Sequence, residues 1–205
     1  MHKPRISARL TAICVAAALL SVAAAPVMGA ASRAPTFERP NCVVFIDPVA
    51  AGETTSEVHG ARCFKSFSEA MAYATGGRVK LPANASRESY SIDAINAIVA
   101  GESLIGRDYE DPDYSCNIFG PCLDWWVQND FGCNGGRNYV APTMPTVNGF
   151  NWNDQISSTK AFTGCSSNKN YEHTNYGGAV LTCTPNCSGM GAMNDKTSSK
   201  QWRDL

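Results

Sequence analysis

Histidine is scarce in this chain, which has three in 205 residues. Only His59 and His173 follow residue 30, and neither belongs to an HExxH motif or another paired metal-ligand spacing. The chain also lacks the GxSxG elbow that presents a catalytic serine. Glu110, Asp111 and Asp113 offer carboxylates, but neighbouring acids on one hairpin are more typical of a solvated turn than of a glycosidase pair. We expect exposed structural roles for both histidines and a protein that is not an enzyme.

Basic residues are also fewer than acidic residues. Residues 31–205 carry 14 basic and 18 acidic side chains, a net charge near −4. A nucleic-acid partner needs a clustered basic face, and a charged membrane surface attracts a polybasic patch. Neither is present, so we expect no nucleic-acid partner.

Long apolar runs are absent after the N-terminus. In residues 1–30, Lys3, Arg5 and Arg9 precede an apolar run of 16 residues, Leu10 to Ala25, which ends at Pro26. A bilayer span needs roughly 20 apolar residues, and this pattern is instead typical of a secretory signal peptide. We predict a secreted, extracellular protein without stable membrane insertion. Cleavage after Ala25, Ala30 or Ala31 stays open.

Eight cysteines remain after the predicted signal peptide. An even number in an exported chain indicates disulfides. The sequence does not determine the connectivity, and our hypothesis is one of roughly a hundred combinations. It pairs Cys42 with Cys63, Cys116 with Cys122, Cys133 with Cys165, and Cys183 with Cys187. The alternative is a zinc site, but the close pairs "CNIFGPC" and "CTPNC" lack the CxxC spacing of zinc ribbons.

The chain changes character near Gly101. Residues 31–41 are an expected flexible lead-in, and residues 42–102 form an expected small α/β region. Its elements are a strand at 42–49, a polar loop at 52–60, a helix at 66–77, a strand "RVKLP" at 78–82 and a helix at 91–102. The first helix is supported by a capping box, because Ser66 is followed three residues later by Glu69.

Residues 103–205 show an all-β pattern of short alternating segments between Gly, Asn, Pro and Ser. The strands expected here are 103–110, 125–128, 158–163, 169–173 and 179–183. We therefore predict an α+β protein whose C-terminal domain is all-β. We also expect a monomer.

This domain contains an internal repeat. The hexapeptide "NDQISS" at 153–158 returns as "NDKTSS" at 194–199. Each copy follows two tyrosines separated by four residues: Tyr109 and Tyr114 in the first, Tyr171 and Tyr176 in the second, where Gly178 comes next but one. The first copy is longer, and we interpret the added length, which includes Cys116, Cys122, Trp125, Trp126 and Cys133, as a disulfide-fastened insertion.

The paired tyrosine signatures and hexapeptides resemble the βγ-crystallin Greek-key family. More closely, "YEHTNYGG...CTPNCSGMGAMNDKTSS" is similar to secreted actinobacterial proteins grouped with the small metalloproteinase inhibitors of that fold. The resemblance covers roughly residues 103–203 and implies a double Greek-key sandwich. One departure is Cys116, which stands where the family has a glycine with positive φ, so we expect strain or a relaxed hairpin there.

Calcium fits the two hexapeptides chemically, because it is a hard cation that takes six to eight oxygen ligands. The resemblance implies paired sites, each joining a hydroxyl of one hexapeptide to oxygens of the other and of a tyrosine hairpin. The candidate ligands are Asp154, Gln155 (carbonyl), Ser157, Asp195, Lys196 (carbonyl), Ser198, Glu110 and Glu172. So few charges predict a Kd on the order of 10⁻⁶ to 10⁻³ M. The alternative is a pair of metal-free Asx or Ser turns.

Two further segments suggest partners. Trp125 and Trp126 alternate across one strand, so one enters the core and the other can face a sugar or protein, unless both cover a core edge. The proline-containing "APTMPTVNG" at 141–149 is either an inhibitor loop or an ordinary connection. Our leading hypothesis is a non-enzymatic, calcium-binding βγ-crystallin-like protein. The alternatives are an inhibitor of a secreted metalloproteinase and an antimicrobial or cell-wall-binding protein.

Overall fold

The computed structural model describes residues 38–99, 101–117 and 119–205. The predicted signal peptide, residues 1–30, lies outside the described residues, as does most of the predicted lead-in. In the described part of the chain, no helix is long and apolar enough to cross a membrane.

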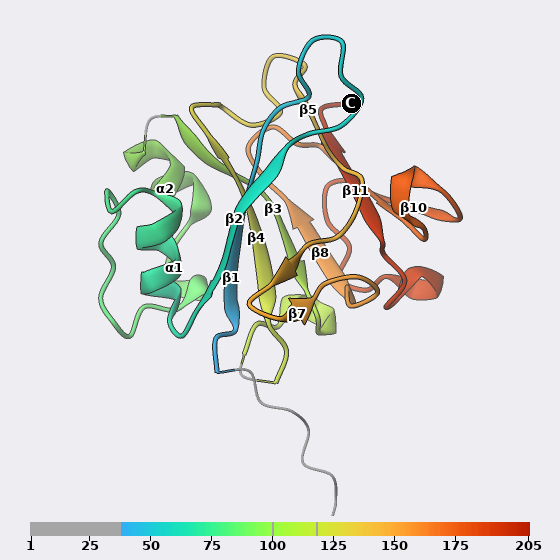
Figure 1. Cartoon of the computed structure of the whole chain (residues 1–205). Coiled ribbons are helices and arrows are strands. Elements are labelled where there is room, and N and C mark those ends of the chain that lie inside the picture. Colours follow the sequence, from blue (N-terminus) through green and yellow to red (C-terminus); the bar gives the residue numbers. More distant parts are fainter. Residues whose placement is uncertain (1–37, 100, 118) are drawn as a thin grey trace, which may run out of the picture. The chain divides into compact units, whose positions relative to one another are not determined.

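The strands build two main sheets and one small hairpin. Their bounds are β1 Asn41–Ile46, β2 Val58–Phe64, β3 Glu102–Tyr109, β4 Cys122–Gln128, β5 Asn138–Ala141, β6 Thr146–Val147, β7 Phe150–Asn151, β8 Ser158–Ala161, β9 Ser167–Tyr171, β10 Val180–Cys183 and β11 Ser199–Arg203. The helices are α1 Phe67–Ala74 and α2 Ile92–Ile98, with single 3-10 turns η1 Arg87–Ser89, η2 Pro112–Tyr114, η3 Thr174–Tyr176 and η4 Gly191–Met193. The five-stranded sheet has the order β2-β1-β4-β3-β8 and the four-stranded sheet β10-β9-β11-β5, while β6 and β7 pair with each other (Figure 1).

The strand order contains two interlocked Greek keys. In the first, β3 lies between β4 and β8, and the third strand, β5, belongs to the opposite sheet. In the second, β9 lies between β10 and β11, and the third segment crosses over to bridge Cys187 with Thr159 of β8. In both, the fourth strand returns beside the first, which defines a Greek key. The prediction of an α+β fold with a C-terminal Greek-key domain is confirmed.

The N-terminal region extends the first Greek-key sheet. Strand β1 pairs with β2 antiparallel and with β4 parallel, so the sheet continues across the expected boundary near residue 102. Two details of the prediction are wrong. "RVKLP" is not a strand, because Val79 bonds to the Thr75 hydroxyl at the end of α1 instead of to a sheet. The expected polar loop contains the start of β2, an edge strand whose exposed residues hide the apolar pattern.

Helix α1 begins where the sequence predicts. The Ser66 hydroxyl accepts the Glu69 N–H at 3.2 Å, and the Ser66 N–H donates to Glu69 Oε2 at 3.1 Å. This confirms the capping box. The helix then buries Phe67, Ala70, Met71 and Ala74.

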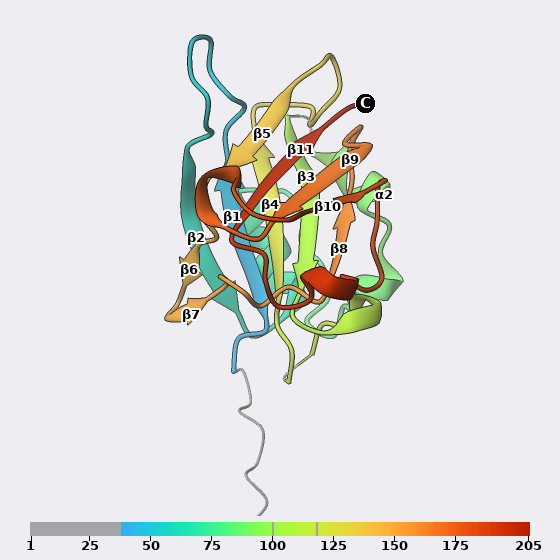
Figure 2. The same cartoon turned by 90° about the vertical axis from the view of Figure 1, so that its right-hand side faces the viewer.

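Both faces of the five-stranded sheet are covered. We call the face that contacts the four-stranded sheet the inner face and the face under α1 and α2 the outer face (Figure 1, Figure 2). On β4, Leu123, Trp125 and Val127 join the inner core, while Trp126 joins the outer core with residues of α1 and β1. Trp125 and Trp126 are both 0% exposed. The two tryptophans do point in opposite directions, but neither reaches the surface because the N-terminal region covers the outer face.

The four disulfides join Cys42 to Cys63, Cys116 to Cys122, Cys133 to Cys165, and Cys183 to Cys187. These are the pairs of our hypothesis, and they leave no described thiol for zinc. The first bridge joins residues that face each other on β1 and β2. The interpretation of Cys116 to Cys133 as an insertion is wrong, because β4 within it is the second strand of the first Greek key.

The two sheets are tied together by a buried ion pair. Lys200 of β11 donates to Asp108 of β3, and both side chains are 0% exposed. Asp108 also accepts from Thr159 at 2.6 Å and from Trp125 Nε1 at 2.7 Å. A buried charge is tolerated only when it is paired and hydrogen-bonded in this way. This polar network explains why β11 was missed, since Lys200 interrupts the apolar pattern.

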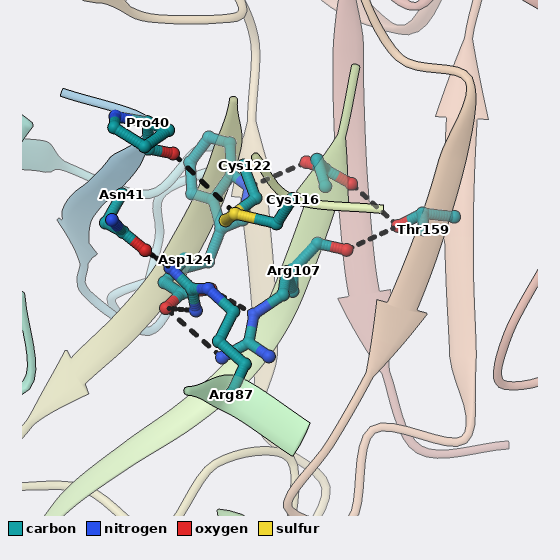
Figure 3. Close-up of polar contacts among 10 residues, drawn as sticks. Pro40, Asn41, Arg87, Arg107, Cys116, Cys122, Asp124 and Thr159 are labelled. Atoms are coloured by element: carbon teal, nitrogen blue, oxygen red, sulfur yellow. Dashed lines mark hydrogen bonds and ion pairs between the residues drawn. A yellow bond between two sulfur atoms is a disulfide. The ribbon is translucent and has the colours of Figure 1, made fainter. Parts of the chain in front are cut away.

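A second charged cluster lies on the outer face, where Asp124 of β4 bonds to both Arg87 of η1 and Arg107 of β3 (Figure 3). The Arg87–Asp124 contact is 2.7 Å. Burial alone would raise the pKa of Asp124, but the charges of Arg107 and Arg87 outweigh burial and lower it.

The two sheets approach each other closely at Gly106. A Cβ there would lie 2.4 Å from Trp202 Nε1, closer than any side chain permits. We expect Gly106→Ala to lower the free energy of unfolding, measured in urea, by about 1–3 kcal/mol, the usual cost of overpacking a core. Gly189→Ala is the control, because a Cβ at Gly189 meets nothing within 4 Å. Equal stability of the two variants would contradict this packing.

Asp124 should make stability depend on pH. A carboxyl with a lower pKa in the folded state stabilises the protein above its unfolded pKa of about 3.9, and this contribution is lost as the pH falls toward the folded pKa. We expect the free energy of unfolding in urea to decrease below about pH 4. Asp124→Asn should cost about 3–5 kcal/mol at neutral pH and remove this part of the acid slope. If the unfolding free energy of Asp124→Asn falls below about pH 4 as steeply as that of wild type, the role of Asp124 is refuted. Asp93→Asn, at an exposed position, is the control.

Candidate functional site

The two tyrosine hairpins have the same local geometry. The Tyr109 and Tyr114 rings lie 5.7 Å apart, and the Tyr171 and Tyr176 rings 5.6 Å apart. Tyr114 and Tyr176 have φ values of 63° and 65°. Each hairpin folds back over the end of its strand, which brings its backbone to a hexapeptide of the same Greek key.

The last serine of each hexapeptide holds its hairpin closed. The Ser158 hydroxyl accepts the Tyr114 N–H at 3.1 Å and donates to the Asp111 carbonyl at 2.7 Å. The Ser199 hydroxyl does the same with the Tyr176 N–H at 3.0 Å and the His173 carbonyl at 2.7 Å. Both serines are fully buried. Sequence reasoning missed this role, although the repeated final serine was its signal.

The preceding serine of each hexapeptide reaches across to the other copy. Ser157 Oγ donates to Asp195 Oδ1 at 3.0 Å, and Ser198 Oγ donates to Asp154 Oδ1 at 3.1 Å. We call Ser157 with Asp195 the first corner and Ser198 with Asp154 the second corner. The resemblance implied this exchange between copies, and the structure brings these four side chains together in that way.

Backbone contacts lock the exchange in place. The Asp154 N–H donates to the Thr197 carbonyl, and the Asp195 N–H donates to the Ile156 carbonyl, both at 3.1 Å. Both aspartates have positive φ, 56° and 52°, a conformation that Asp tolerates better than most residues. The reciprocal contacts between the two hexapeptides therefore involve the main chain as well as the side chains.

The neighbouring asparagine orients each aspartate. Asn153 Nδ2 donates to Asp154 Oδ2 and Asn194 Nδ2 to Asp195 Oδ2, both at 2.7 Å. Each carboxylate thus has one oxygen fixed by the asparagine and the other directed to the serine of the opposite copy. A preset carboxylate of this kind needs little reordering to bind a cation.

The other two hexapeptide candidates stand beside the aspartates. The Gln155 side-chain amide donates to the Asp154 carbonyl at 2.7 Å, so its side chain braces the loop. Lys196 is exposed, and its N–H donates to the Met193 carbonyl. Their carbonyl groups remain candidates for ligation.

The glutamates differ between the corners. Glu110 follows Tyr109, whose carbonyl accepts the Ser157 N–H, and Glu172 follows Tyr171, whose carbonyl accepts the Ser198 N–H. Burial, then the charges of Asp111 and Asp195, raise the pKa of Glu110, which places its carboxyl near the first corner. Glu172 Oε2 instead accepts the Ala179 N–H at 3.1 Å and braces its own hairpin.

The two hairpins differ at Cys116, where the backbone of the first relaxes from the conformation of Gly178 in the second. Gly178 has a φ of 75°, and a Cβ there would lie 2.9 Å from Glu172 Cβ. Cys116 has no positive φ and forms its disulfide with Cys122 instead. Of the two expected outcomes, relaxation is the one observed.

The corners offer oxygen atoms rather than a cluster of strong metal ligands. Across residues 38–99, 101–117 and 119–205, no three His, Cys, Asp or Glu side chains gather as a metal-binding group. Each corner supplies a carboxylate, a hydroxyl and nearby carbonyl oxygens. Most of these oxygens are uncharged, and such a set suits weak binding of a hard cation.

Of the two segments expected to contact partners, the tryptophan pair is buried and "APTMPTVNG" is partly buried. Because Trp125 and Trp126 have no exposed surface, they do not form an exposed sugar or protein anchor in this structure, and that expectation is corrected. In "APTMPTVNG", Met144 and Val147 belong to the inner core, and the Met144 N–H donates to the Ser198 carbonyl. This segment is therefore anchored beside the second corner.

No protein-family model matches the chain, and no curated protein matches it. Among solved structures, it is similar to a betagamma-crystallin from an archaeon, with 22% identity, 50% of this chain and 98% of that chain covered, and a TM-score of 0.33. It is also similar to a double mutant of a betagamma-crystallin domain from Clostridium beijerinckii, with 27% identity, coverages of 48% and 96%, and a TM-score of 0.34. Since both TM-scores are low, the Greek-key assignment rests on the strand order.

Removing either closing serine should loosen its hairpin. Ser158→Ala leaves the Tyr114 N–H and the Asp111 carbonyl without their partner, and Ser199→Ala does the same in the second copy. We expect each to lower the free energy of unfolding by about 1–3 kcal/mol, the cost of unsatisfied buried polar groups. Ser188→Ala, an exposed serine, is the control. Losses below about 0.5 kcal/mol, as at ordinary surface positions, would contradict the role.

Proposed function

We propose that the protein is a non-enzymatic calcium-binding protein whose two corners each hold one ion. The observation that carries the proposal is the reciprocal contact of Ser157 with Asp195 and of Ser198 with Asp154. It creates two oxygen-lined sites that each need both Greek keys. An ion in either corner ties the two halves of the domain together.

The donor chemistry supports calcium over other metals. In the first corner the available oxygens are Asp195, Ser157 and the Glu110 hairpin, and in the second they are Asp154, Ser198 and the Glu172 hairpin. The carbonyl oxygens of Gln155 and Lys196 complete the sets. Calcium prefers such oxygens, whereas zinc and copper favour imidazole or thiolate, and all eight described cysteines are in disulfides.

The low formal charge sets the expected strength. Each corner has one hexapeptide aspartate, and positively charged Lys196 lies beside Asp195. Extracellular sites with few carboxylates bind calcium with Kd values on the order of 10⁻⁴ to 10⁻³ M, and sensor sites on the order of 10⁻⁷ to 10⁻⁵ M. We place this protein between these classes, so that calcium acts mainly as a stabiliser of the folded domain.

The metal-free alternative has its own support, because the serine–aspartate bonds already close both corners. For calcium to bind, each serine hydroxyl must stop donating its hydrogen bond to the aspartate and instead coordinate the ion through its oxygen.

An extracellular location for this role agrees with the four disulfides, which persist in oxidising surroundings.

Calcium titration by calorimetry tests the proposal. We expect two ions per chain, and only one in Asp154→Asn or in Asp195→Asn, because each variant removes the carboxylate of one corner while keeping its size. Free calcium at about 100 times Kd should stabilise the native state by about 2.7 kcal/mol per site. Asp93→Asn, at an exposed position of α2, is the control. The absence of heat and of any rise in Tm at about millimolar calcium would overturn the proposal.

A further inference from the structure

A cavity on the outer face is separate from the two calcium corners. It has a volume of about 420 Å³ and is lined by Arg87, Arg107, Tyr109, Tyr114, Ser115 and Lys160. These residues come from η1, β3, η2 and β8, so the N-terminal region and the first Greek key build it jointly. We call it the outer cavity.

The floor of the outer cavity has more positive than negative charge. Arg87 and Arg107 both bond to the single carboxylate of Asp124, through Arg87 Nη1 at 2.7 Å and Arg107 Nη2 at 3.2 Å, with a further bond from Arg107 Nε (Figure 3). The two arginine side chains are 7% and 6% exposed. The single carboxylate thus compensates only one of the two guanidinium charges, and an uncompensated buried charge is costly.

One arginine donor remains without a partner. Arg87 directs Nη1 to Asp124 and Nη2 to Asn41 at 3.1 Å, but its buried Nε has no hydrogen-bond partner among the described residues. A guanidinium group can only donate, so this N–H needs an acceptor that residues 38–99, 101–117 and 119–205 do not supply.

Lys160 adds a third cation on the other side of the cavity. Its Nζ lies 4.0 Å from the centre of the Tyr114 ring. Burial first, and then the charge of Arg107, lower its pKa, which places it in the positive field of the floor. Two exposed acids, Glu88 and Asp113, also line the cavity, and the charge of Glu88 acts on the pKa of Lys160 in the opposite direction to that of Arg107. They offset part of the positive charge at the mouth of the cavity, whereas the buried floor has two guanidinium groups and one carboxylate.

We propose that the outer cavity binds an oxyanion, the phosphate or carboxylate group of a small molecule, through Arg87, Arg107 and Lys160. An oxyanion would add negative charge beside the two buried guanidinium groups and Lys160, and it would approach Arg87, which has one donor without a partner among the described residues. The planar fork of arginine suits both groups, because each presents two oxygens side by side. The half-buried ring of Tyr114 provides an apolar wall for the rest of such a molecule.

Nuclear magnetic resonance of the wild-type chain gives the direct test. The Arg87 Nε–H signal is followed while inorganic phosphate or glucuronate replaces chloride at constant ionic strength, with glucose as the neutral probe. We expect saturable shifts at Arg87 with at least one anion and none with glucose. A response to phosphate alone identifies a phosphate group as the ligand, and a response to glucuronate alone a carboxylate. No saturable shift with either anion overturns the proposal.

A charge variant completes the test. Lys160→Gln removes one cation without breaking the arginine–aspartate cluster, and we expect it to weaken anion binding about tenfold, the effect of roughly one charge-assisted hydrogen bond. Lys169→Gln, on β9 of the other sheet, has similar partial burial and should bind like wild type. If Lys160→Gln and Lys169→Gln bind the anion with the same affinity, whether that of wild type or a weaker one, the proposed site is contradicted.

Discussion

The structure depends on covering both faces of one sheet. A Greek-key pair buries only the surfaces between its two sheets. Without further cover, Trp126, Leu104 and Arg107 on the outer surface of β4 and β3 would be exposed to water. Strand β1 enters this sheet beside β4, and α1 and α2 close over the outer face. The N-terminal region is therefore part of the hydrophobic core and not an appended module. Its placement also creates the arginine cluster and the outer cavity.

A second constraint is the exchange between the two Greek keys. Each corner takes its serine from one hexapeptide and its aspartate from the other, so neither copy can form a corner alone. The buried Asp108–Lys200 pair joins the same two halves from inside the sandwich. An ion in a corner would act on contacts that are already present, which suits a stabilising role better than a switch.

Local chemistry was predictable where the interaction spans a few residues. The capping box at Ser66, the repeated hexapeptides and the tyrosine hairpins all act between positions close in sequence or duplicated in it, so their patterns survive in the chain. Errors arose where distant residues decide the outcome. Strand β11 was overlooked because Lys200 is buried by pairing with Asp108. The start of β2 was predicted to be a loop, because an edge strand need not bury alternate side chains.

The sequence by itself determined the number of disulfide-forming cysteines, the all-β character of the C-terminal region and the oxygen-rich character of the hexapeptides, because composition and repetition are properties of the chain. The double Greek-key class came from the resemblance of the tyrosine signatures and hexapeptides to a known family. Only the tertiary structure decided that Trp126 is buried, that the N-terminal region extends the first sheet, and that two arginines share one carboxylate. These outcomes depend on which strands become neighbours, and long-range pairing is set by the burial of whole surfaces rather than by any short motif.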